Sequence, residues 1–165
     1  MKNIVLIGMP GTGKSTVGVL LAKSLLMDFC DTDLIIQKKY SKPLCEIIAD
    51  IGTEGFISAE DNILADIRLE NTVIATGGSA VYGEKAMKSL KENGIAVYLD
   101  TPLEELEKRL LNIHTRGVAM KEGTTLGDLF SEREPLYKKY ADITVECVEL
   151  SPEECVERIV EMLSE

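Results

Sequence analysis

The sequence predicts an α/β domain, a parallel β-sheet covered by helices on both faces. Short, continuous apolar segments alternate along the whole chain with longer segments that carry apolar residues at helical spacing. The apolar segments, such as 2–7 and 95–99, lack the polar alternation of strands that face water, so we expect both of their faces to be buried. Since the 165 residues contain no linker rich in Pro, Gly or Ser, one domain over 1–165 is expected.

Local signals predict each element in turn. Strands are expected at 2–7, 28–30, 72–75, 95–99 and 143–145, which gives a five-stranded sheet. Helices are expected at 15–26, 34–40, 43–50, 56–70 and 85–92, the last closed by Asn93 and Gly94. Two further helices should begin at Thr101-Pro102 and Ser151-Pro152, where a capping residue precedes proline and glutamate. The segment 113–124 has no periodicity, so we expect a mobile loop.

Composition narrows the function classes. The net charge is −10, from 18 Lys+Arg against 28 Asp+Glu, which argues against nucleic-acid binding but permits a small anionic ligand at a local positive site. No apolar run approaches the length of a membrane span, and 4–7 is too short for a signal peptide. The four cysteines form no CxxC pair, so free buried thiols are expected. We therefore expect a cytoplasmic protein that makes no contact with a membrane.

The strongest motif is a phosphate-binding loop. Residues 8–15, with the sequence GMPGTGKS, match G-x-x-x-x-G-K-[ST] at every position, after a predicted strand and before a predicted helix. The glycines allow successive backbone N–H groups to face a phosphate, and the helix N-terminus adds positive charge. Lys14 would reach the β- and γ-phosphates, and the Ser15 hydroxyl would bind Mg²⁺. The motif predicts an ATP-binding site.

A pair of carboxylates follows the second predicted strand. Because the carboxyl ends of parallel strands share one edge, Asp31 and Asp33 should lie beside the phosphate loop. Asp31 would complete the Mg²⁺ shell through water, and Asp33 would orient or deprotonate an acceptor hydroxyl. The alternative is that one of them only caps the following helix, and the local sequence does not decide between the two.

Other candidates lie at the same edge. Gly77 and Gly78 end the strand at 72–75, where missing side chains allow a ligand close to the backbone or simply a tight turn. Arg109 ends a predicted helix and could stack on adenine, and Arg116 lies in the predicted loop, from which it could neutralise charge on a transferring phosphoryl group. Arg133 stands between two glutamates, where a local ion pair is the alternative.

Together these motifs resemble those of the shikimate kinase family, from the first strand to the final helix. Members of that family are P-loop kinases that transfer the γ-phosphate of ATP to a ring hydroxyl of shikimate, with Mg²⁺ and a lid that closes. The resemblance implies a P-loop kinase fold, a lid at about 113–124 and an acceptor-binding helical segment at about 32–62.

The resemblance also implies roles for individual residues. On the donor side, Arg109 is similar to the family's adenine-stacking arginine and Pro152 to the residue that lines the adenine. The nucleotide phosphates would lie against Gly11, Thr12, Gly13, Lys14, Ser15 and Thr16, with Ser15 and Asp31 at the metal.

On the acceptor side, the resemblance places Asp33 on the substrate hydroxyls and makes Arg116 the catalytic arginine of the lid. Arg133 stands in E-R-E-P-L-Y, which resembles the family's E-R-x-P-L-Y, whose arginine grips the shikimate carboxylate. Gly77 and Gly78 would line the same site.

Three positions depart from the family pattern, all in the acceptor site or lid. Ile57 replaces the arginine of F-R-x-x-E, the family's second clamp on the carboxylate, although Phe56 and Glu60 keep their places. Ser79 replaces the third glycine of G-G-G, and the lid's R-P-L-L is R-G-V-A at 116–119. Removing one partner of a desolvated charge pair costs about 2–5 kcal/mol, so we hypothesise that phosphoryl transfer survives while acceptor choice has drifted.

The predicted function is therefore ATP- and Mg²⁺-dependent phosphorylation of a hydroxyl on a small molecule by a monomeric, shikimate kinase-like enzyme. One alternative is a kinase of the same fold for another small hydroxy acid, such as homoserine. A nucleoside monophosphate kinase would need arginines for the acceptor phosphate, and only Arg68 stands in the region 57–68. A nucleotide-binding regulator without turnover is the last alternative.

Overall fold

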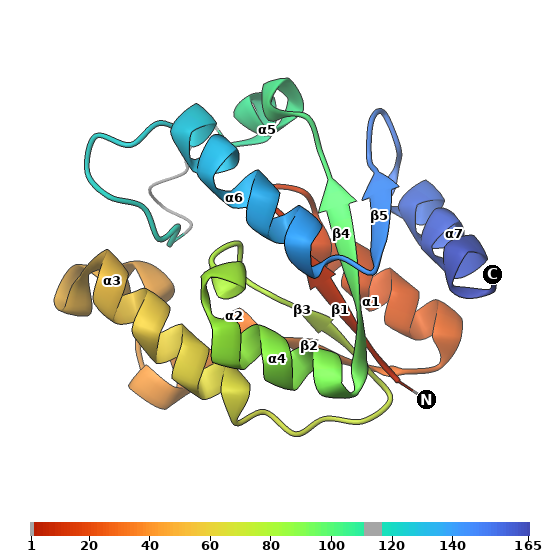
Figure 1. Ribbon diagram of the computed structural model, residues 1–165, viewed down its shortest axis with the longest axis horizontal. Helices are drawn as coiled ribbons and strands as arrows, with labels where there is room; N and C mark the ends of the chain where they lie inside the picture. The colour runs from red at the N-terminus through yellow and green to blue at the C-terminus, as the bar shows by residue number, and fades with distance from the viewer. Residues whose placement is uncertain (1, 111–116) are drawn as a thin grey trace.

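The computed structural model describes residues 2–110 and 117–165 and contains one parallel sheet (Figure 1). Its five strands are β1 (Asn3–Ile7), β2 (Asp28–Asp31), β3 (Thr72–Ala75), β4 (Gly94–Asp100) and β5 (Ile143–Glu146). They lie in the order β2-β3-β1-β4-β5, each parallel to its neighbours. The predicted five-stranded parallel sheet is confirmed.

Helices connect the strands in the manner of an α/β fold. The α-helices are α1 (Lys14–Leu25), α2 (Thr32–Tyr40), α3 (Leu44–Ala65), α4 (Glu84–Glu92), α5 (Leu103–Arg109), α6 (Leu126–Tyr140) and α7 (Pro152–Leu163), and η1 (Ala80–Tyr82) is a 3₁₀ turn. None of the helices within 2–110 and 117–165 is long and apolar enough to cross a bilayer.

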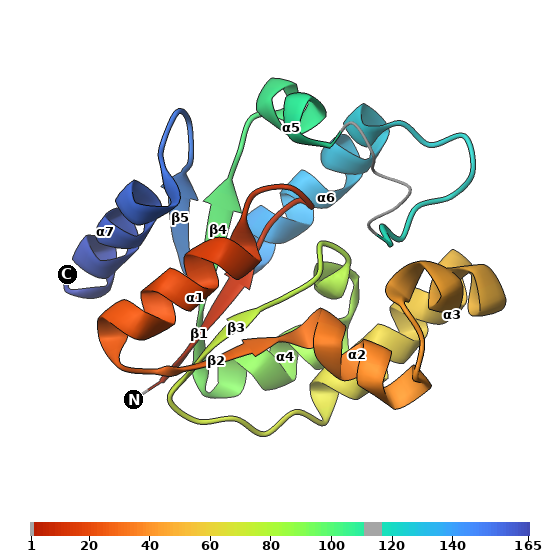
Figure 2. The ribbon, with the colours of Figure 1, turned by 180° about the vertical axis from the view of Figure 1, so that it is seen from behind.

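Alternate residues of β1 enter two separate cores. Val5 and Ile7 face a core shared with α3, α4 and α6, whereas Ile4 and Leu6 face a core shared with α1 and α7. Figure 2 shows α1 and α7 side by side on the second face. Because both sides of the sheet are covered, the inner strands β1 and β3 are buried along their whole length, whereas the edge strands β2 and β5 are partly exposed.

The direction of the strands determines where the loops meet. The loops after β1, β2 and β3 leave the sheet at the same edge, because all three strands are parallel and adjacent. Those loops carry the phosphate-binding motif, Asp31 and Asp33, and Gly77-Gly78, respectively. The fold therefore brings together the three motifs that the sequence analysis singled out.

Several local expectations are wrong. The helix expected to reach residue 70 ends at Ala65, and α6 was not anticipated. Thr101 does not cap α5, because Pro102 occupies the N-cap and the buried Thr101 hydroxyl has no partner within the described residues. Cys30 is only half-buried and Cys45 is exposed, while Cys147 and Cys155 are buried.

Other local expectations are confirmed. Ser151 caps α7 in a reciprocal capping box with Glu154, and Pro152 is the first residue of the helix. The two helices expected at 43–50 and 56–70 are present as the two parts of α3, which are separated at Gly52, where the backbone is not helical (φ 75°, ψ 170°). A residue with a Cβ is strained at that φ, so glycine suits the bend.

Gly94 does not end a helix in the left-handed conformation but begins β4. A Cβ on Gly94 would lie 2.4 Å from the Leu90 carbonyl oxygen, which belongs to the backbone of α4 and cannot rotate away. We therefore expect Gly94→Ala to lower the free energy of unfolding by about 2 kcal/mol, measured by urea denaturation. Gly127→Ala is the control, since its Cβ would meet nothing closer than 3.5 Å. Equal stability of the two variants would contradict this account of Gly94.

Candidate active site

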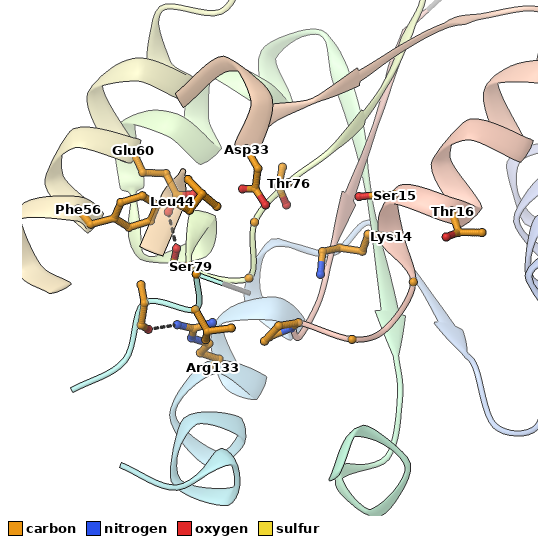
Figure 3. Close-up of a pocket in the computed structure, with 18 residues that line it drawn as sticks. Lys14, Ser15, Thr16, Asp33, Leu44, Phe56, Glu60, Thr76, Ser79 and Arg133 are labelled. Carbon is orange, nitrogen blue, oxygen red and sulfur yellow. Dashed lines mark hydrogen bonds between the residues drawn. The ribbon is translucent and has the colours of Figure 1, made fainter. Parts of the chain in front are cut away.

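The carboxyl edge of the sheet carries a cavity of about 300 Å³ (Figure 3). Lys14 and Ser15 lie on one side of it, and Leu44, Phe56 and Glu60 lie on the opposite side. Asp33 lies between these two sides, and Arg133 lies below Ser79 in this view. The cavity therefore extends from the phosphate-binding loop to a chamber that is lined by both apolar and charged side chains.

The phosphate-binding loop has the geometry that its sequence predicts. Gly11 and Gly13 both have φ of 88°, which side chains other than glycine rarely adopt, and Gly13 is the N-cap of α1. The Lys14 ammonium donates to the carbonyl oxygens of Gly8 at 2.7 Å and Met9 at 2.8 Å. Burial lowers the pKa of Lys14 to about 8, while Asp33 opposes that shift.

Ser15 and Asp31 are in direct contact. The Ser15 hydroxyl donates to Asp31 Oδ2 at 2.8 Å, and the other carboxylate oxygen of Asp31 accepts from the Asp33 N–H at 3.0 Å. Asp31 is thus the N-cap of α2 and also a neighbour of the phosphate loop, and its role at Mg²⁺ stays a prediction.

A hydroxyl beside a carboxylate suits Mg²⁺, which prefers oxygen ligands. The described residues contain no cluster of three or more His, Cys, Asp or Glu that could hold a metal. A magnesium ion at Ser15 and Asp31 would therefore take its remaining ligands from phosphate oxygens and water, as is usual in kinase sites.

Asp33 does not cap α2, and its side chain points into the cavity (Figure 3). Burial raises the pKa of this carboxyl to about 6, with a further contribution from Asp31, and Lys14 opposes the shift. A carboxylate in this position can accept a hydrogen bond, or a proton, from a hydroxyl bound in the cavity.

Gly77 and Gly78 are closely packed, and neither has a positive φ. A Cβ on Gly77 would lie 2.9 Å from Asp33 Oδ1, and one on Gly78 would lie 2.8 Å from Arg133 Nη1. Both glycines line the cavity. Their missing side chains let the two charged groups approach the strand end.

Arg133 is buried, with 1% of its surface exposed. It therefore does not form the exposed ion pair with a neighbouring glutamate that the sequence analysis gave as the alternative. Its Nη2 donates to the Ala119 carbonyl oxygen at 2.6 Å, and its Nε donates to the Tyr82 hydroxyl at 3.4 Å. Within the described residues Arg133 forms no salt bridge. The cavity thus holds a cation whose charge no carboxylate neutralises directly.

Ile57 takes the place of the arginine that clamps the acceptor carboxylate in the family pattern. It is half-buried, and the described lining of the cavity includes Phe56 and Glu60 but not Ile57. Ser79, whose role the sequence did not reveal, lines the cavity and donates to Glu60 Oε1 at 2.5 Å. Because residues 60 and 79 lie on different elements, no local pattern could have revealed their contact.

The remaining candidates lie around the phosphate loop. Arg109 Nη1 donates to the Gly11 carbonyl oxygen at 3.2 Å, and the guanidinium also pairs with Glu105. Thr12 is buried beside Lys14, and Thr16 lines both the main cavity and an open groove that reaches Pro152. Arg116 lies outside the described residues. Of the lid expected at about 113–124, only 117–124 are described, and these residues form neither helix nor strand.

Known proteins are similar to this chain in both sequence and fold. A model of the family "Shikimate kinase" matches residues 10–164. A shikimate kinase of Tolumonas auensis is 36% identical over 98% of this chain and 96% of its own. Threonine synthase-like 1 of Homo sapiens is 37% identical over 96% of this chain but only 22% of its own length.

Solved structures of shikimate kinases have the same fold as this chain. Shikimate kinase from Acinetobacter baumannii in complex with shikimate superposes with a TM-score of 0.91 and 32% identity, over 99% of this chain and 93% of the other. The enzyme from Aquifex aeolicus superposes with a TM-score of 0.83 and 35% identity, over 98% and 96%. Since both sequence and fold coincide, the chain belongs to the shikimate kinase family and is a P-loop kinase, an ATP:alcohol phosphotransferase.

Proposed function

We propose that this kinase transfers the γ-phosphoryl group of MgATP to a ring hydroxyl of shikimate. One observation supports it most: a single cavity holds the Lys14 ammonium, the Asp33 carboxylate and the Arg133 guanidinium. These groups suit a phosphate tail, an acceptor hydroxyl and an acceptor carboxylate, respectively. A relative that matches 99% of this chain was solved with shikimate bound.

The donor side would hold the nucleotide by its phosphates. Lys14 and the backbone N–H groups of 11–16 would bind the phosphate oxygens, and the N-terminus of α1 would add positive charge. Ser15 and Asp31 would hold Mg²⁺, which when bound neutralises negative charge on the phosphates. Arg109 and Pro152, which flank the loop and its helix, would contact the adenine.

The acceptor side would position the alcohol. Asp33 would accept a hydrogen bond from the reacting hydroxyl and thereby orient its oxygen toward the phosphate loop. Arg133 would bind the carboxylate, helped by its burial, which strengthens the pairing. Gly77 and Gly78 would let the ring approach the backbone, and the segment 32–62 would form the acceptor wall. Arg116 would complete the site from the lid by neutralising charge on the transferring group.

A different small hydroxy acid is the second candidate acceptor, and one observation favours it. The position of the family's second carboxylate clamp is Ile57, an apolar residue that does not line the described part of the cavity. An assay of ADP release with shikimate and a panel of hydroxy acids, sugars and nucleotides separates the candidates. A kcat/KM for shikimate in the ordinary enzyme range of about 10⁴–10⁸ M⁻¹s⁻¹ would refute a change of acceptor.

Lys14→Ala and Asp33→Asn should each lower kcat at least 100-fold while the affinity for ATP falls much less. Lys14 would act mainly on charge that develops in the transition state, and Asp33 would act only on the acceptor. Steady-state kinetics and calorimetric ATP binding measure the two effects separately. Turnover of Asp33→Asn close to that of the wild type would remove Asp33 from the mechanism.

The rate should depend on pH in a bell shape. Below its pKa of about 6 the Asp33 carboxylate becomes protonated and can no longer accept from the acceptor, so kcat/KM should rise from pH 5 to 7. Above a pKa of about 8 Lys14 loses its charge, so kcat/KM should fall from pH 8 to 9.5. Samples returned to pH 7 should recover full activity. A flat profile over pH 5–7 would contradict the role of Asp33.

Ile57→Arg should lower the KM for shikimate roughly 10-fold or more, because a second guanidinium near the acceptor wall would add a charge-assisted hydrogen bond to the carboxylate. Ile57→Gln, which adds length without charge, is the matched control and should leave the KM nearly unchanged. If the arginine variant bound shikimate no better than the glutamine variant, the missing clamp would not limit the affinity for shikimate.

A further inference from the structure

Tyr82 contacts the guanidinium of Arg133 in two ways, although it does not line the described part of the cavity. It ends the 3₁₀ turn η1, which packs against α6, the helix that carries Arg133. The Arg133 Cζ lies 5.3 Å from the centre of the Tyr82 ring, within the range of a cation–π interaction. The Arg133 Nε also donates to the Tyr82 hydroxyl at 3.4 Å. Tyr82 therefore acts on a charged group of the cavity from behind the cavity wall.

The Tyr82 hydroxyl is itself held by a carboxylate. It donates to Glu132 Oε1 at 2.7 Å, so its one proton is committed to Glu132 and a lone pair remains for Arg133 Nε. Burial raises the pKa of Tyr82, the bond to Glu132 raises it further, and Arg133 opposes the shift. Since the ordinary pKa of tyrosine is already about 10, the hydroxyl stays protonated at neutral pH and keeps this direction.

Both carboxylates next to Arg133 in the sequence have other partners. Glu132 accepts from Tyr82, and Glu134 pairs with Lys138 at 2.8 Å. Residues adjacent in a helix point in different directions, so neither glutamate is placed to pair directly with Arg133. Among the residues that the structure describes, the Arg133 charge accordingly has no salt bridge and stays available to an anion.

The three nitrogens of the Arg133 guanidinium have three different neighbours. Nε donates to Tyr82, Nη2 donates to the Ala119 carbonyl oxygen at 2.6 Å, and a Cβ on Gly78 would lie 2.8 Å from Nη1. Nη1 has no acceptor in the described part of the chain, and Gly78 beside it lines the cavity. Because the guanidinium is planar and rigid, fixing two of its nitrogens also sets the direction of the third.

We propose that Tyr82 is a positioning residue of the acceptor site, which holds the Arg133 guanidinium in the orientation that binds an anionic group of the acceptor. The inference rests on the proposed function and deepens it. Ile57 stands where the family pattern has its second arginine, so the acceptor carboxylate would depend on Arg133 alone. A guanidinium that is already oriented loses less conformational freedom when the anion binds, and this raises the affinity.

The test compares Tyr82 variants on acceptors with and without a negative charge. Wild type, Tyr82→Phe and Tyr82→Leu are assayed with shikimate and with its carboxamide, which has the same ring and hydroxyl groups but no charge. Tyr82→Phe keeps the ring and loses the hydroxyl, and should raise the KM for shikimate roughly threefold. Tyr82→Leu loses both contacts, and should raise this KM roughly 10- to 30-fold.

The effect should be confined to the charged acceptor. For the carboxamide, the KM of both Tyr82 variants should stay within about twofold of the wild-type value, because an uncharged group gains little from the guanidinium. Where turnover of the carboxamide is too slow to follow, its inhibition constant against shikimate is compared instead. The kcat with shikimate and the KM for ATP should also stay within about twofold, since Tyr82 acts on neither the reacting hydroxyl nor the nucleotide.

Tyr140→Leu is the matched control. The Tyr140 ring also lies at a cation–π distance from a cation, 5.0 Å from the Lys139 ammonium, and belongs to α6, but it is not among the described residues that line the cavity. Loss of this ring should leave the KM for shikimate unchanged. A rise equal to that of Tyr82→Leu would mean that any aromatic contact on α6 matters equally, and would overturn the specific role of Tyr82.

The other outcomes are distinct. An unchanged KM for shikimate in both Tyr82 variants, or an equal rise for shikimate and the carboxamide, would overturn the role of Tyr82 while the proposed function stands. If the leucine variant does not fold, the phenylalanine variant decides alone. A wild-type enzyme that does not phosphorylate shikimate would overturn the proposed function and, with it, the inference. A KM rise confined to the charged acceptor would establish the role.

Discussion

The site depends on four ionisable side chains around one cavity, the buried Lys14, Glu60 and Arg133 and the half-buried Asp33. Burying an isolated charge is costly, but these groups carry opposite signs and moderate one another. Asp33 raises the pKa of Lys14 against the effect of burial, and Arg133 lowers that of Glu60. The four groups therefore form one unit, and the parallel strands that end at this edge supply the framework for it.

The sequence could predict the parts of the fold and site that local patterns encode. The apolar segments gave all five strands, and the phosphate-loop motif placed Lys14 and Ser15 correctly. The role of Asp31 could not be decided, since capping and contact with Ser15 use different oxygens of one carboxylate. Helix α6 was missed because Pro135 and many charged residues conceal its apolar face, and the burial of Arg133 depends on that helix.

The two halves of the cavity differ in how closely they follow the family. The phosphate-loop side keeps every residue of the family pattern, whereas the acceptor side has Ile57 and Ser79 in place of arginine and glycine. The two replacements stand near one carboxyl group, since Ser79 donates to Glu60 and Ile57 lies one helical turn before Glu60.

The bend of α3 at Gly52 has a geometric consequence for the acceptor wall. In a straight helix, Leu44 and Glu60 would be separated by roughly 24 Å along the axis, since each residue adds about 1.5 Å. Both nevertheless line one cavity of about 300 Å³ that also reaches the phosphate loop. The helical geometry is interrupted at Gly52, so the two parts of α3 run in different directions and both reach this cavity. The backbone conformation of one glycine thus helps to set the position of the acceptor wall.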